Sequence, residues 1–406
     1  MKAFPAGLRS LLSDRWILVL LLVGLLLRVG IGLGLHHHFR NANPPHVWQG
    51  TDEALYYTCG KRSAEFLKSD GWKAFIEAPP RPEYLNWVFF KYTGLILYAA
   101  GDSPLALRVI SVVLEMAGIA LLLGAFAPRF ERRSQRLFFT GLLCFFPSFA
   151  FWSALAIKEG AILFLTGLLC LGMTRFWKHA TPWPALVLAA GICLALGSFR
   201  IWAGIGFFLL IASILLIRHP GRPKLLHVVP MVLTVIVGLW FIPSVQFLLT
   251  RHILGWETKI MPIRKQVEPD SPAIDRLGSL EGGTFSIPVK AALAWVLPVP
   301  GVPGDNALVS LSGFENVAFL GLCLLAYAGM RRKLAPLEWM WLFMGLMILA
   351  MAILFGTDLG TIYRSKIAAL PFIAYFAACA LPRALDSVRD HARTRAPTAT
   401  PHAALP

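Results

Sequence analysis

The run Trp16–Leu35 (WILVLLLVGLLLRVGIGLGL) decides the fold class, because Arg28 is its only charged residue. A helix of about 20 apolar residues is long enough to cross the roughly 30 Å hydrocarbon core of a bilayer. No small-residue cleavage site follows the run, so we interpret it as a retained span and not as a signal peptide that is removed. The sequence therefore predicts a membrane helix near the beginning of the chain.

The rest of the chain repeats this pattern. The 406 residues are 57% hydrophobic and only 15% charged, with a mean hydropathy of +0.64, whereas soluble domains contain about 25% charged residues. A membrane β-barrel would show short alternating segments instead. We predict an all-α, polytopic transmembrane helical bundle of about ten spans. The expected spans are 16–35, 105–127, 137–157, 161–177, 183–199, 201–217, 228–249, 307–330, 337–355 and 367–381.

Basic residues give the expected orientation and the expected partners. The formal net charge is +16, but the bases sit in short loops between spans and not on one soluble face. This distribution indicates positive-inside topology and contact with anionic membrane lipids, and it argues against nucleic acid as a partner. Both termini are then cytoplasmic.

We predict one transmembrane catalytic domain over 1–382 and a disordered, basic cytoplasmic tail over 383–406. Two larger outer loops, 36–104 and 250–305, interrupt the spans. The first contains an expected helix over 54–68 and an apolar piece over 84–98, which is short for a span and is interpreted as a helix in the membrane interface.

The sequence contains no cysteine or histidine pattern typical of a metal site. Five of the six cysteines lie inside apolar runs and no Cys-x-x-Cys pair exists, which excludes a zinc framework. The histidines 36–38 are consecutive, and three consecutive side chains cannot all point at one ion from a regular helix or strand.

Charged side chains at the ends of several spans face the same, outer side of the membrane in this topology. The first group lies in the stretch 50–57 (GTDEALYY), which contains Asp52 and Glu53, and the second is Lys158 with Glu159. Bundle packing could bring these ends together into one site. The other members are Arg200 in a tight turn and four residues of the turn 356–366, namely Asp358, Tyr363, Arg364 and Lys366.

A carboxylate beside several cations suits sugar transfer from a lipid phosphate. The carboxylate takes the proton of an acceptor hydroxyl as that oxygen attacks the anomeric carbon. The phosphate that leaves is a weak base, so it needs positive charge from Arg or Lys and no general acid. An interfacial site lets a polyprenyl tail stay in lipid.

Each charged group also has a simpler explanation. Acids after Thr51 are favoured in the first turn of any helix by capping and by the helix dipole. Lys158 and Glu159 can merely mark the end of a span, and Arg364 and Lys366 can bind phospholipid head groups. Arg28, an ionisable residue inside a span, is a functional candidate that can alternatively snorkel or pair with a nearby acid.

Four segments together resemble the GT-C class of integral-membrane glycosyltransferases, which includes bacterial relatives of protein O-mannosyltransferases and of lipid A aminoarabinose transferases. GTDEALYY places an acid pair shortly after span one. SPLALRVISVVLEMAGIALLLGAF (103–126) resembles the second span of the class, and FFPSFAFWSALAIKEGAILFLTGLL (145–169) resembles the third and fourth. TIYRSKIAALPFIAY (361–375) resembles a late element with an arginine before an apolar span. The resemblance covers 16–177 and, more weakly, 355–382.

The resemblance implies roles for single residues. Asp52 matches the catalytic base, with Glu53 beside it, and Glu159 matches a second outer acid that assists the acceptor or a divalent cation. No other cofactor is implied. The remaining residues would contact the donor phosphate by position and charge, namely Lys158, Arg200, Arg364 and Lys366.

The expected function is transfer of a sugar from a polyprenyl-phosphate donor to a glycan or lipid-linked acceptor, in polysaccharide biosynthesis on the outer face of a bacterial inner membrane. Two alternatives stay open at this point. One is an O-antigen polymerase-like or ligase-like protein that relies on outer-loop arginines without an essential acid. The other is a transporter of lipid-linked sugars or an assembly subunit, with charges along the bundle interior.

Overall fold

We analysed a computed structural model of the chain, which describes residues 14–48, 52–77, 87–178, 183–199, 204, 207, 307–355 and 368–381. Within these ranges the protein is all-helical and contains no strand, as predicted. The helices are α2 (Arg15–His38), α3 (Asp52–Ser69), α4 (Gly71–Glu77), α5 (Trp87–Ala100), α6 (Pro104–Phe126), η1 (Ala127–Arg129), α7 (Arg133–Phe145), α8 (Pro147–Ser153), α9 (Glu159–Lys178), α10 (Trp183–Phe199), α17 (Ala307–Met330) and α18 (Pro336–Phe355), followed by a helix over Ala368–Leu381.

Two described helices are long and apolar enough to cross a membrane, Arg15–His38 and Pro104–Arg129. A third span is added if α7 and α8, which are bent by 54° at a short break, are counted as one. This is the pattern of a membrane protein. The expected spans 201–217 and 228–249 lie outside the described residues, apart from residues 204 and 207, and so does the loop 250–305.

Helix α2 shows the reversed amphipathicity that lipid demands. Its buried face contains Arg28 between Gly24 and Gly32, while large apolar side chains cover the exposed face. These exposed residues are Trp16, Leu18, Val19, Leu22, Val23, Leu26, Leu27 and Leu33. An apolar outer face around a charged inner residue is stable only where the surroundings are apolar.

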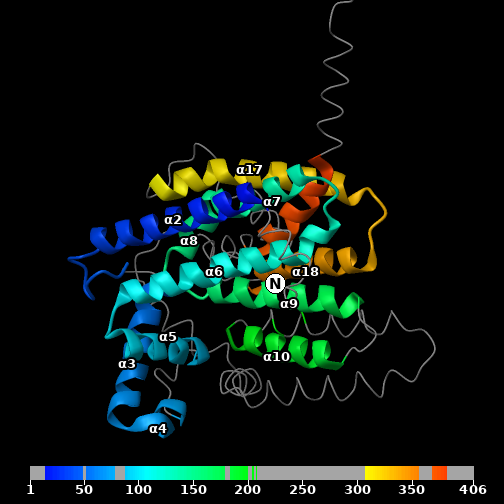
Figure 1. The fold of residues 1–406 in the computed structure, drawn as a ribbon. Coiled ribbons are helices and arrows are strands. Elements are labelled where there is room, and N and C mark those ends of the chain that lie inside the picture. Colours follow the sequence, from blue (N-terminus) through cyan, green and yellow to red (C-terminus); the bar gives the residue numbers. More distant parts are fainter. Residues whose placement is uncertain are drawn as a thin grey trace, which may run out of the picture.

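Helices α2, α6 and α9 run side by side, whereas α3 begins near one end of α6, runs away from it and packs against α5 (Figure 1). Small residues allow α6 and α9 to approach closely, as in many membrane helix pairs. A Cβ added at Gly118 would lie 2.8 Å from the backbone of Leu163, and one at Gly160 would lie 2.5 Å from the carbonyl oxygen of Ser111. The register between the two helices is therefore fixed, and with it the position of the start of α9.

The starts of α2 and α7 meet at the other end of α2. Asp14 accepts a hydrogen bond from the backbone N–H of Trp16 (3.1 Å) and so caps α2. The same carboxylate pairs with Arg133 at the start of α7, 2.6 Å away. Hydrogen bonding from Arg133 lowers the pKa of Asp14 to about 2, so the pair persists at neutral pH.

The expected span 137–157 is wrong as one continuous helix. The chain leaves the helical conformation at Phe146 and restarts at Pro147, the first residue of α8. Proline has no N–H to donate and disfavours a helical conformation in the residue before it. The backbone after α8 forms a short turn before α9 begins at Glu159.

Candidate functional site

Glu53 is the centre of the contacts between the start of α3 and the first part of α6. Its carboxylate pairs with Arg108 of α6 through two hydrogen bonds, 2.7 Å from Nε and 2.8 Å from Nη2. The same two oxygens accept the backbone N–H groups of Ala156 (3.0 Å) and Trp48 (3.1 Å). Both charged side chains are almost completely buried, with 2% and 1% of their surface exposed.

This set of bonds joins four parts of the chain at one point: the loop before α3, the start of α3, helix α6 and the segment between α8 and α9. Arg108 also lies 3.4 Å from the carbonyl oxygen of Gly32 in α2. A buried charge pair is stable only if its remaining donors and acceptors are satisfied, and the backbone amides of Trp48 and Ala156 serve this purpose. Glu53 therefore has a positioning role.

Asp52 is the first residue of α3 and is half-buried, next to Glu53. Its backbone position is set by the bonds of its neighbour. Helix α3 therefore presents one carboxylate, from Glu53, to the interior of the protein, and the adjacent one, from Asp52, near its surface.

Lys158 and Glu159 follow the same segment that Glu53 holds. The hydroxyl of Ser111 in α6 lies 3.4 Å from the carbonyl oxygen of Ile157 and donates to it. The ammonium nitrogen of Lys158 lies 5.9 Å from the centre of the Tyr56 ring in α3, within cation–π range. Glu159 is half-buried in the first turn of α9.

The structure thus brings together two of the four charged groups that the sequence placed at the outer side: Asp52 with Glu53, and Lys158 with Glu159. The others lie outside the described residues, namely Arg200, Asp358, Tyr363, Arg364 and Lys366.

Arg28 does not belong to this group. Its guanidinium is fully buried and pairs with Glu115 of α6 at 3.2 Å. It also donates to Ser153 Oγ (2.9 Å) and to the carbonyl oxygens of Cys144 (2.7 Å) and Leu143 (2.9 Å). Of the two simpler explanations for Arg28, snorkelling and pairing with an acid, the structure shows pairing.

A second polar cluster ties α3 to the turn before α6, and sequence reasoning missed it. Asp102 accepts a hydrogen bond from the Tyr57 hydroxyl (3.0 Å) and forms an ion pair with Lys61 at 2.7 Å. Burial and the Asp102 carboxylate raise the pKa of Tyr57 to about 12. The spacing of Tyr57 and Lys61, four residues apart on one helix face, was the available signal.

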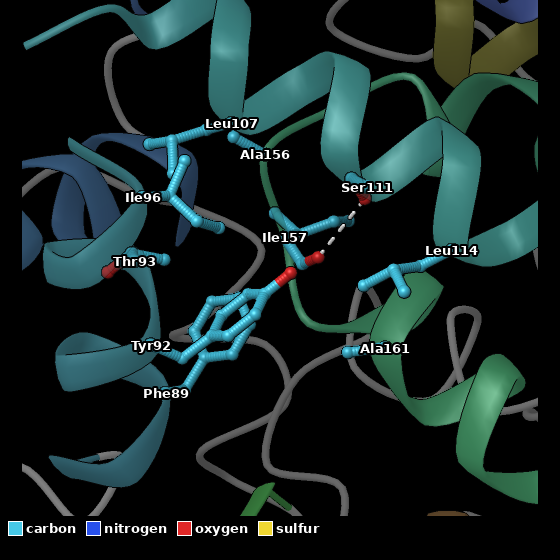
Figure 2. Close-up of a pocket in the computed structure, with 10 residues that line it drawn as sticks. All are labelled: Phe89, Tyr92, Thr93, Ile96, Leu107, Ser111, Leu114, Ala156, Ile157 and Ala161. Atoms are coloured by element: carbon cyan, nitrogen blue, oxygen red, sulfur yellow. Dashed lines mark hydrogen bonds between the residues drawn. The ribbon is translucent and has the colours of Figure 1, made fainter. Parts of the chain in front are cut away.

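A small apolar cavity lies between α5, α6 and the residues that lead into α9 (Figure 2). Phe89 and Tyr92 of α5 form one wall, and Leu114 of α6 with Ala161 of α9 forms the opposite wall. The Tyr92 hydroxyl points across the cavity in Figure 2. Burial raises the pKa of Tyr92 to about 12, so its hydroxyl remains protonated at neutral pH.

His36, in the last turn of α2, stacks on His46 in the loop that follows the helix. The rings of His36 and His46 are parallel with their centres 3.9 Å apart. In the described part of the chain no group of three or more His, Cys, Asp or Glu side chains is arranged to hold a metal ion.

No family model, curated protein or solved structure matches the chain. The functional interpretation therefore rests on the residues at the junction of α3, α6 and α9.

Proposed function

We propose that the protein is a GT-C-type membrane glycosyltransferase. It would have about ten spans, cytoplasmic termini, and a site on the outer face of a bacterial inner membrane. It would transfer a sugar from a polyprenyl-phosphate donor to a glycan or lipid-linked acceptor. One observation carries the proposal: the buried pair of Glu53 and Arg108, with the amide of Ala156, fixes the start of α3 beside the segment that leads to Lys158 and Glu159.

Asp52 would be the general base. It removes the proton of the acceptor hydroxyl while that oxygen bonds to the anomeric carbon and the bond from this carbon to the phosphate oxygen breaks. Polyprenyl phosphate leaves with the electron pair of that bond, and inversion at the anomeric carbon is the expected stereochemistry. Lys158 would stabilise the developing phosphate charge, together with the cations outside the described residues, Arg200, Arg364 and Lys366.

Glu53 and Glu159 would have different roles. The four hydrogen bonds to Glu53 make it a positioning residue, which holds the adjacent Asp52 in place. Glu159, in the first turn of α9, would assist the acceptor or a divalent cation. Separate roles for two adjacent acids distinguish this proposal from one in which both transfer protons.

The test is sugar transfer in isolated membranes supplied with labelled polyprenyl-phosphate sugars. We expect Asp52→Asn to lose about a hundredfold or more of the transfer rate, the size of a lost general base, with an unchanged amount of folded protein. The matched control is Asp70→Asn, an exposed acid just after the other end of α3, which should transfer like the wild type. Normal transfer by Asp52→Asn would refute the assignment of the base, and no transfer by the wild-type protein from any such donor would refute the function.

A further inference from the structure

The break between α7 and α8 exposes backbone groups inside the protein. The last carbonyls of α7 and the first N–H groups of α8 have no partner within their own helices. In an apolar environment each such group must find a partner elsewhere. Side chains from two other helices supply these partners.

Arg28 of α2 provides hydrogen-bond donors for the end of α7. It donates to the carbonyl oxygens of Leu143 and Cys144 in the last turn of that helix. Its positive charge also suits the partial negative charge at a helix C-terminus. In addition, its Nε lies 2.9 Å from the Ser153 hydroxyl at the last residue of α8, so Arg28 fixes the end of α8 relative to the end of α7.

Glu315 of α17 provides hydrogen-bond acceptors for the beginning of α8. It accepts the backbone N–H of Ser148 at 2.8 Å and also the Ser148 hydroxyl. Ser148 is in the first turn of α8, and Glu315 is buried. Helix α8 is therefore held at one end by an acid from α17 and at the other by a base from α2, each with the charge that suits that helix end.

The segment from Ala154 to Lys158 follows directly and leads to the candidate site. Ala154 N–H still donates to the carbonyl of Phe151 in α8 (3.1 Å), and Ala156 N–H donates to Glu53. We propose that Glu315 and Arg28 are positioning residues that set the orientation of α8 and thereby place Lys158 and Glu159 against α3. Only the catalytic importance of this placement rests on the proposed function. The experiment measures the placement itself.

The experiment measures how fast a thiol at position 158 reacts. Lys158→Cys is introduced, and its reaction with a membrane-impermeant methanethiosulfonate reagent is timed in membranes, after subtraction of the rate for the protein without this substitution. Glu315→Ala leaves the Ser148 N–H and hydroxyl without their acceptor, and a lost partner of a buried group is worth about a tenfold change in an equilibrium. We expect labelling about tenfold faster in this background. Glu315→Gln keeps one acceptor oxygen and should give a smaller increase of about threefold, which also serves if the alanine variant does not fold.

Glu338 provides the matched control. This acid is also buried, accepts the N–H of Ala335 (2.8 Å) and hydrogen bonds from Tyr375 and Arg332, but lies in α18 away from this segment. Glu338→Gln should leave the labelling rate unchanged. An unchanged rate in both Glu315 variants would overturn the inference, and so would an equal increase in Glu338→Gln, because the effect would then be general loosening. Loss of transfer in Asp52→Asn without any effect of Glu315 would retain the function and reject only the positioning.

Discussion

The buried pair of Glu53 and Arg108 gives the sharpest prediction about stability. Glu53→Gln keeps the shape of the side chain but faces the Arg108 guanidinium with an uncharged group. The new amide NH₂ replaces one carboxylate oxygen, which accepts two of the four hydrogen bonds. Breaking a buried ion pair on one side costs about 3–5 kcal/mol, because the other charge stays buried. Arg108→Met should cost a similar amount for the same reason.

The double variant Glu53→Gln/Arg108→Met removes both charges, so it should be more stable than the sum of the single changes predicts. We expect a coupling energy of at least about 3 kcal/mol. The assay is equilibrium unfolding of the purified protein in mixed micelles, titrated with a denaturing detergent and followed by circular dichroism. Glu65→Gln, an exposed acid of the same helix, should stay within about 0.5 kcal/mol of the wild type.

Two results would refute this reasoning. If Glu53→Gln is as stable as the wild type, the carboxylate does not hold α3 on α6. If the two single costs add without coupling, Glu53 and Arg108 act independently and the distances of 2.7 and 2.8 Å have no energetic meaning.

Three further predictions use the same unfolding assay or melting temperatures. Gly118→Ala should lower the free energy of unfolding by about 1–3 kcal/mol through overpacking, because the added Cβ would lie 2.8 Å from the backbone of α9. Gly30→Ala has open space around it and should raise the free energy of unfolding by up to about 1 kcal/mol. Equal effects of the two changes would contradict the close contact between α6 and α9. Arg28→Met should lower the free energy of unfolding by about 3–5 kcal/mol, and adding Glu115→Met should restore part of this loss. No restoration would show that the ion pair at 3.2 Å contributes little to stability. The pKa of Tyr57 is raised from 10.0 to about 12, so its contribution to stability should be complete below pH 10 and should decline as the pH rises to about 12. Over that interval the melting temperature of Tyr57→Phe should fall less than the melting temperature of the wild type.

The sequence predicted most helices because apolar runs of this length have few alternatives. The expected helix over 54–68 is α3 (Asp52–Ser69), and the expected span 161–177 is α9 (Glu159–Lys178). The break at Pro147 was missed because average hydropathy does not register a missing N–H. Proline inside an apolar run was the signal that predicts such a break.

The candidate site was predictable only in part, for a physical reason. The predicted topology puts residues 52–53 and the start of α9 on the same side of the membrane, so their approach was expected from the sequence. The pairing of Arg108 with Glu53, 55 residues away along the chain, and of Arg28 with Glu115, 87 residues away, did not follow. Arg108 and Glu115 share a face of one helix, but each finds its partner on a different neighbour, and only the three-dimensional packing selects it.

The hydrogen bonds of Glu53 also constrain when α3 can reach its final position during synthesis of the chain. The amide of Ala156 lies 103 residues after Glu53, which at about 5–20 residues per second corresponds to about 5–20 seconds of synthesis. Until Ala156 has been synthesised and inserted, Glu53 lacks one of its four hydrogen bonds and the contacts that hold the start of α3 are incomplete. We predict that membrane-inserted nascent chains arrested before Ala156 are cut by protease within 52–77, and that chains extended through α9 are protected there. Equal cleavage of the two would show that α3 docks without this segment.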